Sequence, residues 1–254
     1  MGFAVERWGD GAERIVLVHG SLSVGAGAFS EQRALADRFT VDVVTRRGYG
    51  DTAPTVGVDI AQDARDVVEV LGDGAHLVGT SMGGVVSLNA AGLRPDLVRS
   101  LTLIEPPAFA LAADHPDVRR VSDAMKRHWC DAEGAGDHAF VTGFIAALEM
   151  DMALPDPLPP ALAIAVRNLI TERPWKVDVP IGAVADAAFP KLVVTGGWSG
   201  AFDAICRRLA DLLETDLHVL TGAGHGVQKL GAPFNSLLMR LVEHATSPLD
   251  GVVP

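Results

Sequence analysis

Short apolar runs alternate with longer helical patterns along most of this chain, and that alternation limits the folds it can adopt. Six runs are nearly all apolar and rich in β-branched residues, at 14–20, 40–48, 75–80, 100–106, 191–197 and 216–224. Such runs are typical of strands covered on both faces. Helical patterns occupy 30–38, 59–71, 82–93, 202–213 and 232–244. This order predicts an α/β fold with a mostly parallel central sheet flanked by helices. Residues 3–8 are a further candidate, for an edge strand.

The alternation is interrupted once, between the strands predicted at 100–106 and 191–197. This segment contains only helix-like stretches, at 118–129, 137–150 and 160–170, and a run with four prolines at 154–162. We interpret it as a helical insertion over one edge of the sheet. The predicted core then comprises residues 1–106 and 189–254, and the insertion comprises residues 107–188.

The balance of charged residues limits the kinds of molecule that the protein is expected to bind. The 254 residues include 21 basic and 32 acidic side chains, for a net charge of −11. Binding to nucleic acid or to an anionic membrane depends on clustered Lys and Arg, and the sequence contains no such cluster. We therefore expect a small-molecule substrate, no nucleic-acid or membrane partner, and a monomer or homodimer.

The cysteines and the first residues of the chain indicate whether a metal site is expected and where in the cell the protein is expected. Cys130 and Cys206 are far apart and belong to no C-x-x-C motif, so neither a zinc site nor a redox pair is expected. The opening residues have no basic stretch followed by an apolar one, and Glu6 is a poor fit to a myristoylation motif. No apolar run reaches the roughly 18 residues of a membrane span. We expect a cytoplasmic protein without a metal.

A serine stands in a glycine-rich turn between a predicted strand and a predicted helix. Gly79-x-Ser81-x-Gly83 is a G-x-S-x-G motif in the strand–turn–helix context that gives this motif its meaning. Glycine neighbours permit a sharp, strained turn that holds the hydroxyl exposed. The amide dipoles of the following helix favour a developing oxyanion nearby. We therefore predict that Ser81 is a nucleophile rather than a capping residue.

A serine nucleophile needs a base, and His225 has the strongest claim among the eight histidines. It follows the last predicted strand, which places it at the sheet edge that carries Ser81, and it follows Ser81 in the chain. The oxyanion hole is expected from the amide of Met82 and from Ser21 or Leu22, in the loop after the first predicted core strand. That loop does not have the spacing of a phosphate-binding motif, so nucleotide binding is a weak alternative.

Motifs spread over nearly the whole chain resemble the α/β-hydrolase superfamily. They are VLVHGS (16–21), RRGYGDT (46–52), GTSMGG (79–84), LTLIEPP (101–107) and GAGHGVQ (222–228). The resemblance implies a cofactor-free serine hydrolase of the α/β-hydrolase fold with a Ser–His–acid triad. It also implies a helical cap inserted after strand 6, with the substrate pocket between the sheet edge and that cap.

The chain departs from the family pattern at the triad acid. The usual G-x-x-D after the seventh strand has Ser199 in place of the aspartate. Glu105 ends an apolar strand, where an ionised carboxylate needs a partner, and some relatives carry the acid at that strand end. Asp203, in the first turn of the next helix, is the alternative, and a chain with no triad acid is a third possibility.

The nature of the nucleophile indicates the reaction. A serine suits acyl transfer from an ester, lactone, thioester or amide through an acyl-enzyme. We favour hydrolysis of an ester, lactone or thioester with a small to medium, largely apolar group. The alternatives are a carbon–carbon bond hydrolase, a perhydrolase, a biosynthetic lyase or cyclase, and a non-catalytic binding protein. His19 and Trp198 are candidate pocket residues, and five aromatic residues are candidates for pocket or core: Phe109, Trp129, Phe140, Phe144 and Trp175.

Overall fold

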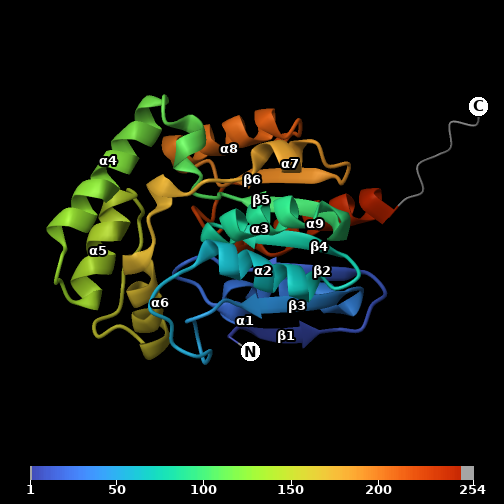
Figure 1. Ribbon diagram of the computed structural model, residues 1–254, viewed down its shortest axis with the longest axis horizontal. Coiled ribbons are helices and arrows are strands. Elements are labelled where there is room, and N and C mark those ends of the chain that lie inside the picture. The colour runs from blue at the N-terminus through green and yellow to red at the C-terminus, as the bar shows by residue number, and fades with distance from the viewer. Residues whose placement is uncertain (1, 247–254) are drawn as a thin grey trace, which may run out of the picture.

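The computed structural model describes residues 2–246, and they form a single sheet of seven strands in the order β1-β3-β2-β4-β5-β6-β7 (Figure 1). The strands are β1 (Ala4–Trp8), β2 (Arg14–Val18), β3 (Thr40–Thr45), β4 (Ala75–Thr80), β5 (Val98–Ile104), β6 (Lys191–Thr195) and β7 (Leu217–Val219). Strand β1 is antiparallel to β3, and every other neighbouring pair is parallel. The predicted mostly parallel sheet is confirmed, and residues 3–8 supply its antiparallel edge.

Helices cover both faces of the sheet because the strands are apolar on both faces. Along β2, Ile15 and Leu17 join one apolar cluster and Val16 and Val18 join the other, as the two-residue period of a strand requires. The first cluster packs against η1 (Ser30–Asp37) and α9 (Ala232–Thr246), and the second packs against α2 (Ile60–Leu71), α3 (Met82–Leu93) and α8 (Gly200–Leu212). Short elements complete this part: α1 (Gly25–Ala28), η2 (Pro95–Leu97) and η5 (Val227–Leu230). None of the helices described is long and apolar enough to cross a membrane.

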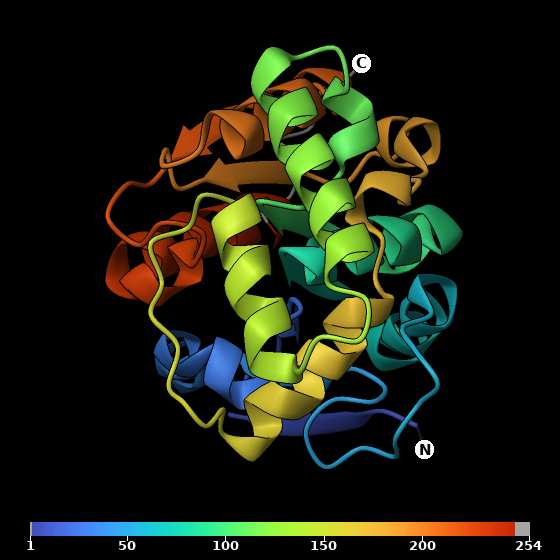
Figure 2. The same ribbon diagram turned by 90° about the vertical axis from the view of Figure 1, so that its left-hand side faces the viewer.

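The segment between β5 and β6 is helical, as the sequence predicts. It contains η3 (Phe109–Ala112), α4 (Pro116–Asp131), α5 (Asp137–Ala147), α6 (Pro160–Thr171), η4 (Pro174–Lys176) and α7 (Ile181–Ala185). Helices α4, α5 and α6 lie together across one end of the sheet, while α7 packs beside α3 (Figures 1 and 2). The insertion follows β5, the fifth strand in chain order, rather than a sixth strand, because only five strands of the described sheet precede it.

Two other elements differ from the sequence expectation. Residues 30–38 are wound as the 3₁₀ helix η1 (Ser30–Asp37) rather than as an α-helix. The last strand is limited to β7 (Leu217–Val219), although the apolar run extends to 224. Gly222 and Gly224 have φ of 111° and 54°, so the chain leaves the sheet in this stretch and turns toward its carboxyl edge.

A buried carboxylate links the three strands β1, β3 and β2 at one edge of the sheet. Asp42 on β3 is fully buried and accepts hydrogen bonds from Arg7 on β1 (2.7 and 3.0 Å) and Arg14 on β2 (2.6 Å). Burial alone raises the pKa of the Asp42 carboxyl, but the hydrogen bonds and charges of the two arginines outweigh burial and bring this pKa below its ordinary value. The ionised form is therefore stabilised by folding.

Asp42→Asn is expected to lower the free energy of unfolding at pH 7 by about 1–2 kcal/mol. Because the folded pKa is depressed, the stability due to ionised Asp42 is present above the unfolded value of about 3.9 and is lost as pH falls through the folded value. The difference between wild type and variant should therefore narrow below about pH 4. Urea unfolding measured from pH 3 to 7 checks this, and a difference independent of pH would contradict it.

Candidate active site

Ser81 lies in the sharp turn between β4 and α3. Its backbone has φ of 52° and ψ of −128°, a combination that non-glycine residues rarely adopt. The Ser81 N–H donates to the carbonyl of Ile104 (2.8 Å), and the Ser81 carbonyl accepts from the N–H of Gly84 (2.8 Å). A Cβ on Gly83 would lie 2.2 Å from the carbonyl oxygen of Val18, so glycine lets the turn pack against the end of β2. The strained turn is thus held on both sides.

His225 connects Ser81 to Glu105. The Nε2 atom of His225 lies 2.9 Å from Oγ of Ser81, and its Nδ1 atom lies 2.5 Å from Oε2 of Glu105. This geometry fits a neutral ring whose Nδ1–H donates to Glu105 while Nε2 accepts the Ser81 hydroxyl. The three residues follow β4, β5 and β7, whose carboxyl ends share one edge of the sheet. A hydroxyl, an imidazole and a carboxylate therefore form one hydrogen-bonded chain.

The carboxylate of Glu105 is fully buried and well supplied with donors. Besides His225, it accepts hydrogen bonds from the N–H of Gly196 (2.7 Å) and the Trp198 indole (2.9 and 3.0 Å), and the Thr195 hydroxyl oxygen lies 2.9 Å away. Burial by itself raises the pKa of the Glu105 carboxyl, but the hydrogen bonds and the charge of His225 outweigh burial and hold this pKa below its ordinary value. Glu105 is therefore kept ionised beside the imidazole.

Asp203, the alternative acid, lies one step further from the imidazole. It stands in the first turn of α8 and accepts a hydrogen bond from the Thr195 hydroxyl (2.5 Å). The same hydroxyl lies 2.9 Å from Glu105, so Asp203 reaches His225 only through Thr195 and Glu105. Ser199, at the position of the usual aspartate, is the N-cap residue of α8. The geometry favours Glu105 over Asp203 as the partner of His225.

Two backbone segments converge on the Ser81 hydroxyl. Met82 begins α3, so its N–H belongs to the first turn of a helix, where the amides have no partner within the helix. The other segment is residues 20–23, which follow β2 and which we call the oxyanion loop after the role expected of it from the sequence. Strand β2 pairs with β4 through Val18 and Gly79, and a Cβ on Gly20 would lie 2.8 Å from Cβ of Ser81. The backbone of both segments thus lies beside the candidate nucleophile.

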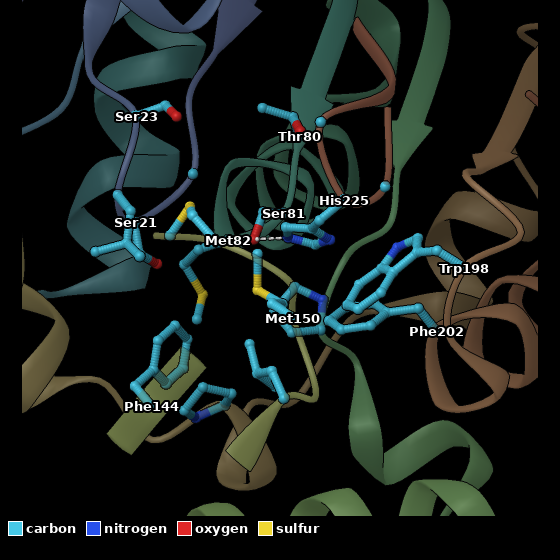
Figure 3. A pocket seen from close by; sticks show the side chains of 18 of the residues that line it. Ser21, Ser23, Thr80, Ser81, Met82, Phe144, Met150, Trp198, Phe202 and His225 are labelled. Carbon is cyan, nitrogen blue, oxygen red and sulfur yellow. Dashed lines mark hydrogen bonds between the residues drawn. The ribbon is translucent and has the colours of Figure 1, made fainter. Parts of the chain in front are cut away.

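A cavity of about 660 Å³ opens at Ser81, a size typical of small-molecule sites. Ser81 and His225 form its polar end, beside Met82, Trp198 and Phe202 (Figure 3). The opposite wall comes from the insertion and is mostly apolar, although Glu149, Asp151 and Glu172 also belong to it. Its main residues are Phe109, Met125, Phe144, Leu148, Met150 and Leu169. The cavity therefore joins a reactive hydroxyl to an apolar compartment.

The prediction that His19 lines the pocket is wrong. Its side chain is fully buried and is absent from the cavity wall, because its Nδ1–H donates to the carbonyl of Gly20 (2.7 Å) and its Nε2 accepts from the N–H of Arg46 (3.1 Å). Burial, and secondarily the charge of Arg46, lower the pKa of His19 to about 3, which keeps the ring neutral at ordinary pH. His19 supports the oxyanion loop from the core side.

The other aromatic candidates divide between wall and core. Trp198, Phe109 and Phe144 line the cavity. Trp129 packs edge-to-face on Phe140 and Trp175, with ring centroids 5.0 and 5.2 Å apart, and these three form an aromatic core within the insertion. Hydrophobic periodicity in a helix does not distinguish a residue that faces a cavity from one that faces a neighbouring helix. The sequence could therefore not assign these aromatic residues to the cavity wall or to the core.

Sequence reasoning missed three acidic residues of the cavity wall: Glu149 and Asp151, which are exposed, and Glu172, which is buried. Glu172 follows α6, is buried, and lines the cavity beside Ser21. It lies in an insertion without recognisable motifs, and its partners are more than 100 positions away in the chain. No local pattern in the sequence indicates such a contact. Within residues 2–246, no group of three or more His, Cys, Asp or Glu side chains is arranged to hold a metal ion.

A parallel α/β sheet with a serine on a strained strand–helix turn and a histidine after the last strand defines the α/β-hydrolase class of folds. The sequence profile of the alpha/beta hydrolase family matches residues 15–234. The chain belongs to the alpha/beta hydrolase family.

Several known proteins are similar to this chain. A pimeloyl-[acyl-carrier protein] methyl ester esterase from Aeromonas hydrophila subsp. hydrophila is 33% identical over 121 residues, which are 46% of this chain and 47% of that protein. The chain thus spans about half the length of this curated relative. A solved alpha/beta hydrolase from Sphaerobacter thermophilus is 28% identical with a TM-score of 0.70, covering 93% of this chain and 96% of that one. A thermophilic esterase from Thermogutta terrifontis, 21% identical with a TM-score of 0.70, covers 96% and 94% and shares the fold.

Proposed function

We propose that this chain is a cofactor-independent serine hydrolase that cleaves an ester, lactone or thioester of a small to medium, largely apolar substrate. The observation that carries the proposal is the hydrogen-bonded chain from Ser81 through His225 to Glu105, with distances of 2.9 and 2.5 Å. Family membership and the resemblance to an esterase over half its length support the same reaction class.

The proposed mechanism assigns one role to each group. Oγ of Ser81 attacks the substrate carbonyl while Nε2 of His225 takes its proton, and Glu105 stabilises the resulting imidazolium. The amides of Met82 and of Ser21 or Leu22 stabilise the tetrahedral oxyanion. Collapse expels the alcohol or thiol, which receives the proton from His225, and leaves an acyl-enzyme. Water, activated by the same imidazole, then releases the acid and regenerates the Ser81 hydroxyl.

We further propose that residues 107–188 act as a cap on a catalytic core of residues 1–106 and 189–254. Side chains from α4, α5 and α6 line the cavity opposite Ser81, and these helices lie over the carboxyl ends of the strands (Figure 2). Their methionine, leucine and phenylalanine side chains favour an apolar acyl or alcohol group. The contact between His225 and Glu105 also weakens the case for a non-catalytic scaffold, which rested on the missing G-x-x-D acid.

The test combines turnover with labelling of the nucleophile. We expect the purified chain to hydrolyse p-nitrophenyl butyrate and p-nitrophenyl acetate, and a fluorophosphonate probe to modify one serine, identified as Ser81 by peptide mass spectrometry. In Ser81→Ala, labelling and turnover should both disappear while the thermal unfolding midpoint stays close to that of wild type. A folded wild-type protein that is not labelled between pH 6 and 9 would overturn the proposal.

A further inference from the structure

A buried hydrogen-bonded cluster contacts the oxyanion loop at Ser21. Its centre is Glu172 in the insertion, whose Oε2 accepts a hydrogen bond from the Ser21 hydroxyl (2.6 Å) and whose Oε1 accepts one from the Tyr49 hydroxyl (3.1 Å). Glu172 is 4% exposed, and Tyr49 is completely buried. One carboxylate of the insertion is thus bonded to the loop that borders Ser81 and, separately, to the core.

The cation beside this cluster, Arg46, already has a hydrogen-bonded carboxylate partner in Asp63, so Glu172 is a second carboxylate near one positive charge. Arg46 is 1% exposed and donates to Asp63 at 2.8 Å, whereas Glu172 lies 3.7 Å from Nη2 of Arg46, outside hydrogen-bond distance. Burial raises the pKa of the Glu172 carboxyl, and Arg46, Ser21 and Tyr49 offset this rise only in part. A carboxyl whose pKa is raised by folding makes the fold less stable as pH rises above the unfolded value, about 4.3. Ionisation of Glu172 therefore lowers the stability of the fold, whereas folding stabilises the ionised forms of Asp42 and Glu105.

We propose that Glu172 is a positioning residue that holds the oxyanion loop in its reactive arrangement through the Ser21 hydroxyl. The inference rests on the proposed function, because it assigns the loop a role in that reaction. The loop is held from two sides. His19 and Arg46 donate to the carbonyl of Gly20 from the core side, at 2.7 and 3.2 Å, and Glu172 fixes the next residue from the insertion side. Amides fixed in this way need no rearrangement when the oxyanion forms.

The proposal predicts an effect on the chemical step rather than on substrate affinity. Amides that point at the oxyanion act on charge that develops in the transition state, so their displacement lowers kcat and leaves KM little changed. A loop shifted by about 1 Å lowers the rate by up to about 100-fold. An apolar wall residue of the same cavity would instead alter KM.

Ser21→Ala is the first test, since it removes the hydrogen bond and leaves every buried charge in place. We expect kcat for p-nitrophenyl butyrate to fall about 10- to 100-fold, with KM changed little. Inhibition by butylboronic acid, which forms a tetrahedral adduct on serine, should weaken in parallel. Ser21→Thr, which retains a hydroxyl donor, should restore most of the activity.

A double-mutant cycle tests whether Ser21 acts through Glu172. Glu172→Met removes the acceptor with an unbranched side chain of similar length, and should lower kcat by a factor similar to that of Ser21→Ala, with circular dichroism verifying that the variant is folded. If the two residues act through one bond, the double variant should be no slower than either single variant. Tyr49→Phe is the matched control, because it removes the other hydrogen bond to Glu172 and leaves the Ser21 contact, so kcat should be unchanged.

The outcomes separate this proposal from the proposed function. A wild-type chain with neither turnover nor labelling overturns the proposed function itself. An active wild type with a fully active Ser21→Ala variant overturns the role of the Ser21–Glu172 bond alone. Multiplicative losses in the double variant, or an equal loss of kcat in Tyr49→Phe, also overturn it. Should Glu172→Met fail to fold, the kcat, KM and boronate measurements on Ser21→Ala and Ser21→Thr decide the matter.

Discussion

Replacing Glu105 with glutamine is expected to lower kcat for p-nitrophenyl butyrate by about 10⁴-fold, the loss found when a triad carboxylate becomes an amide. The carboxylate accepts from Nδ1–H of His225 at 2.5 Å and fixes the tautomer whose Nε2 faces Ser81. An amide NH₂ at this place favours the opposite tautomer, in which Nε2 carries the proton and cannot act as a base. The amide also lacks the negative charge that stabilises the imidazolium. Steady-state kinetics, with Ser81→Ala as the background, measure the loss.

Asp203→Asn is the matched control for this prediction. Asp203 accepts from the Thr195 hydroxyl at 2.5 Å and makes no direct contact with the imidazole, so its loss should change kcat only slightly. Both variants replace a carboxylate with its amide within the same hydrogen-bonded group, and circular dichroism on both verifies the fold. An inactive Asp203→Asn beside an active Glu105→Gln would assign the acid to Asp203 and contradict the proposed triad.

The contacts among Ser81, His225 and Glu105 were predictable because they follow from topology. In a parallel sheet the carboxyl ends of the strands meet at one edge, so Ser81 and Glu105, which directly follow β4 and β5, and the loop after β7, which carries His225, are brought together by the fold itself. Glu105 could also be recognised from the sequence, because an ionisable side chain at the end of an apolar strand needs a partner. Their catalytic roles stay predictions until the variants are measured.

The residues that sequence reasoning misplaced or missed depend on side-chain direction and on contacts distant in the chain. His19 follows a strand as Ser81 does, but its ring turns into the core to bond Arg46 rather than toward the cavity. Glu172 meets Ser21 across 151 positions, through an insertion whose helices have no motif to fix their orientation. Hydrophobic periodicity identified those helices, and it does not specify which residue of a buried face borders a cavity.

Replacing Arg46 with methionine is expected to destabilise the fold by about 3–5 kcal/mol at pH 7, the range for removing one partner of a buried ion pair. Arg46 is 1% exposed, donates to Asp63 at 2.8 Å, and lies 3.7 Å from the Glu172 carboxylate. Without it, two buried carboxyls lose their compensating charge and must bind protons or break the packing. Methionine preserves much of the apolar stem, so the loss reports on charge. Urea unfolding at pH 7 provides the measurement.

The pH dependence of that loss identifies its cause. Burial already raises the pKa values of the Asp63 and Glu172 carboxyls, and removal of Arg46 raises both further. Carboxyls whose folded pKa is raised make the fold less stable as pH rises from the unfolded value toward the folded one, so the deficit of Arg46→Met should grow from pH 4 to 7. Arg47→Met is the control, because Arg47 pairs with Asp66 but is itself 33% exposed, so its loss should be smaller and depend less on pH. A deficit of Arg46→Met that is constant with pH would indicate lost packing rather than uncompensated charge.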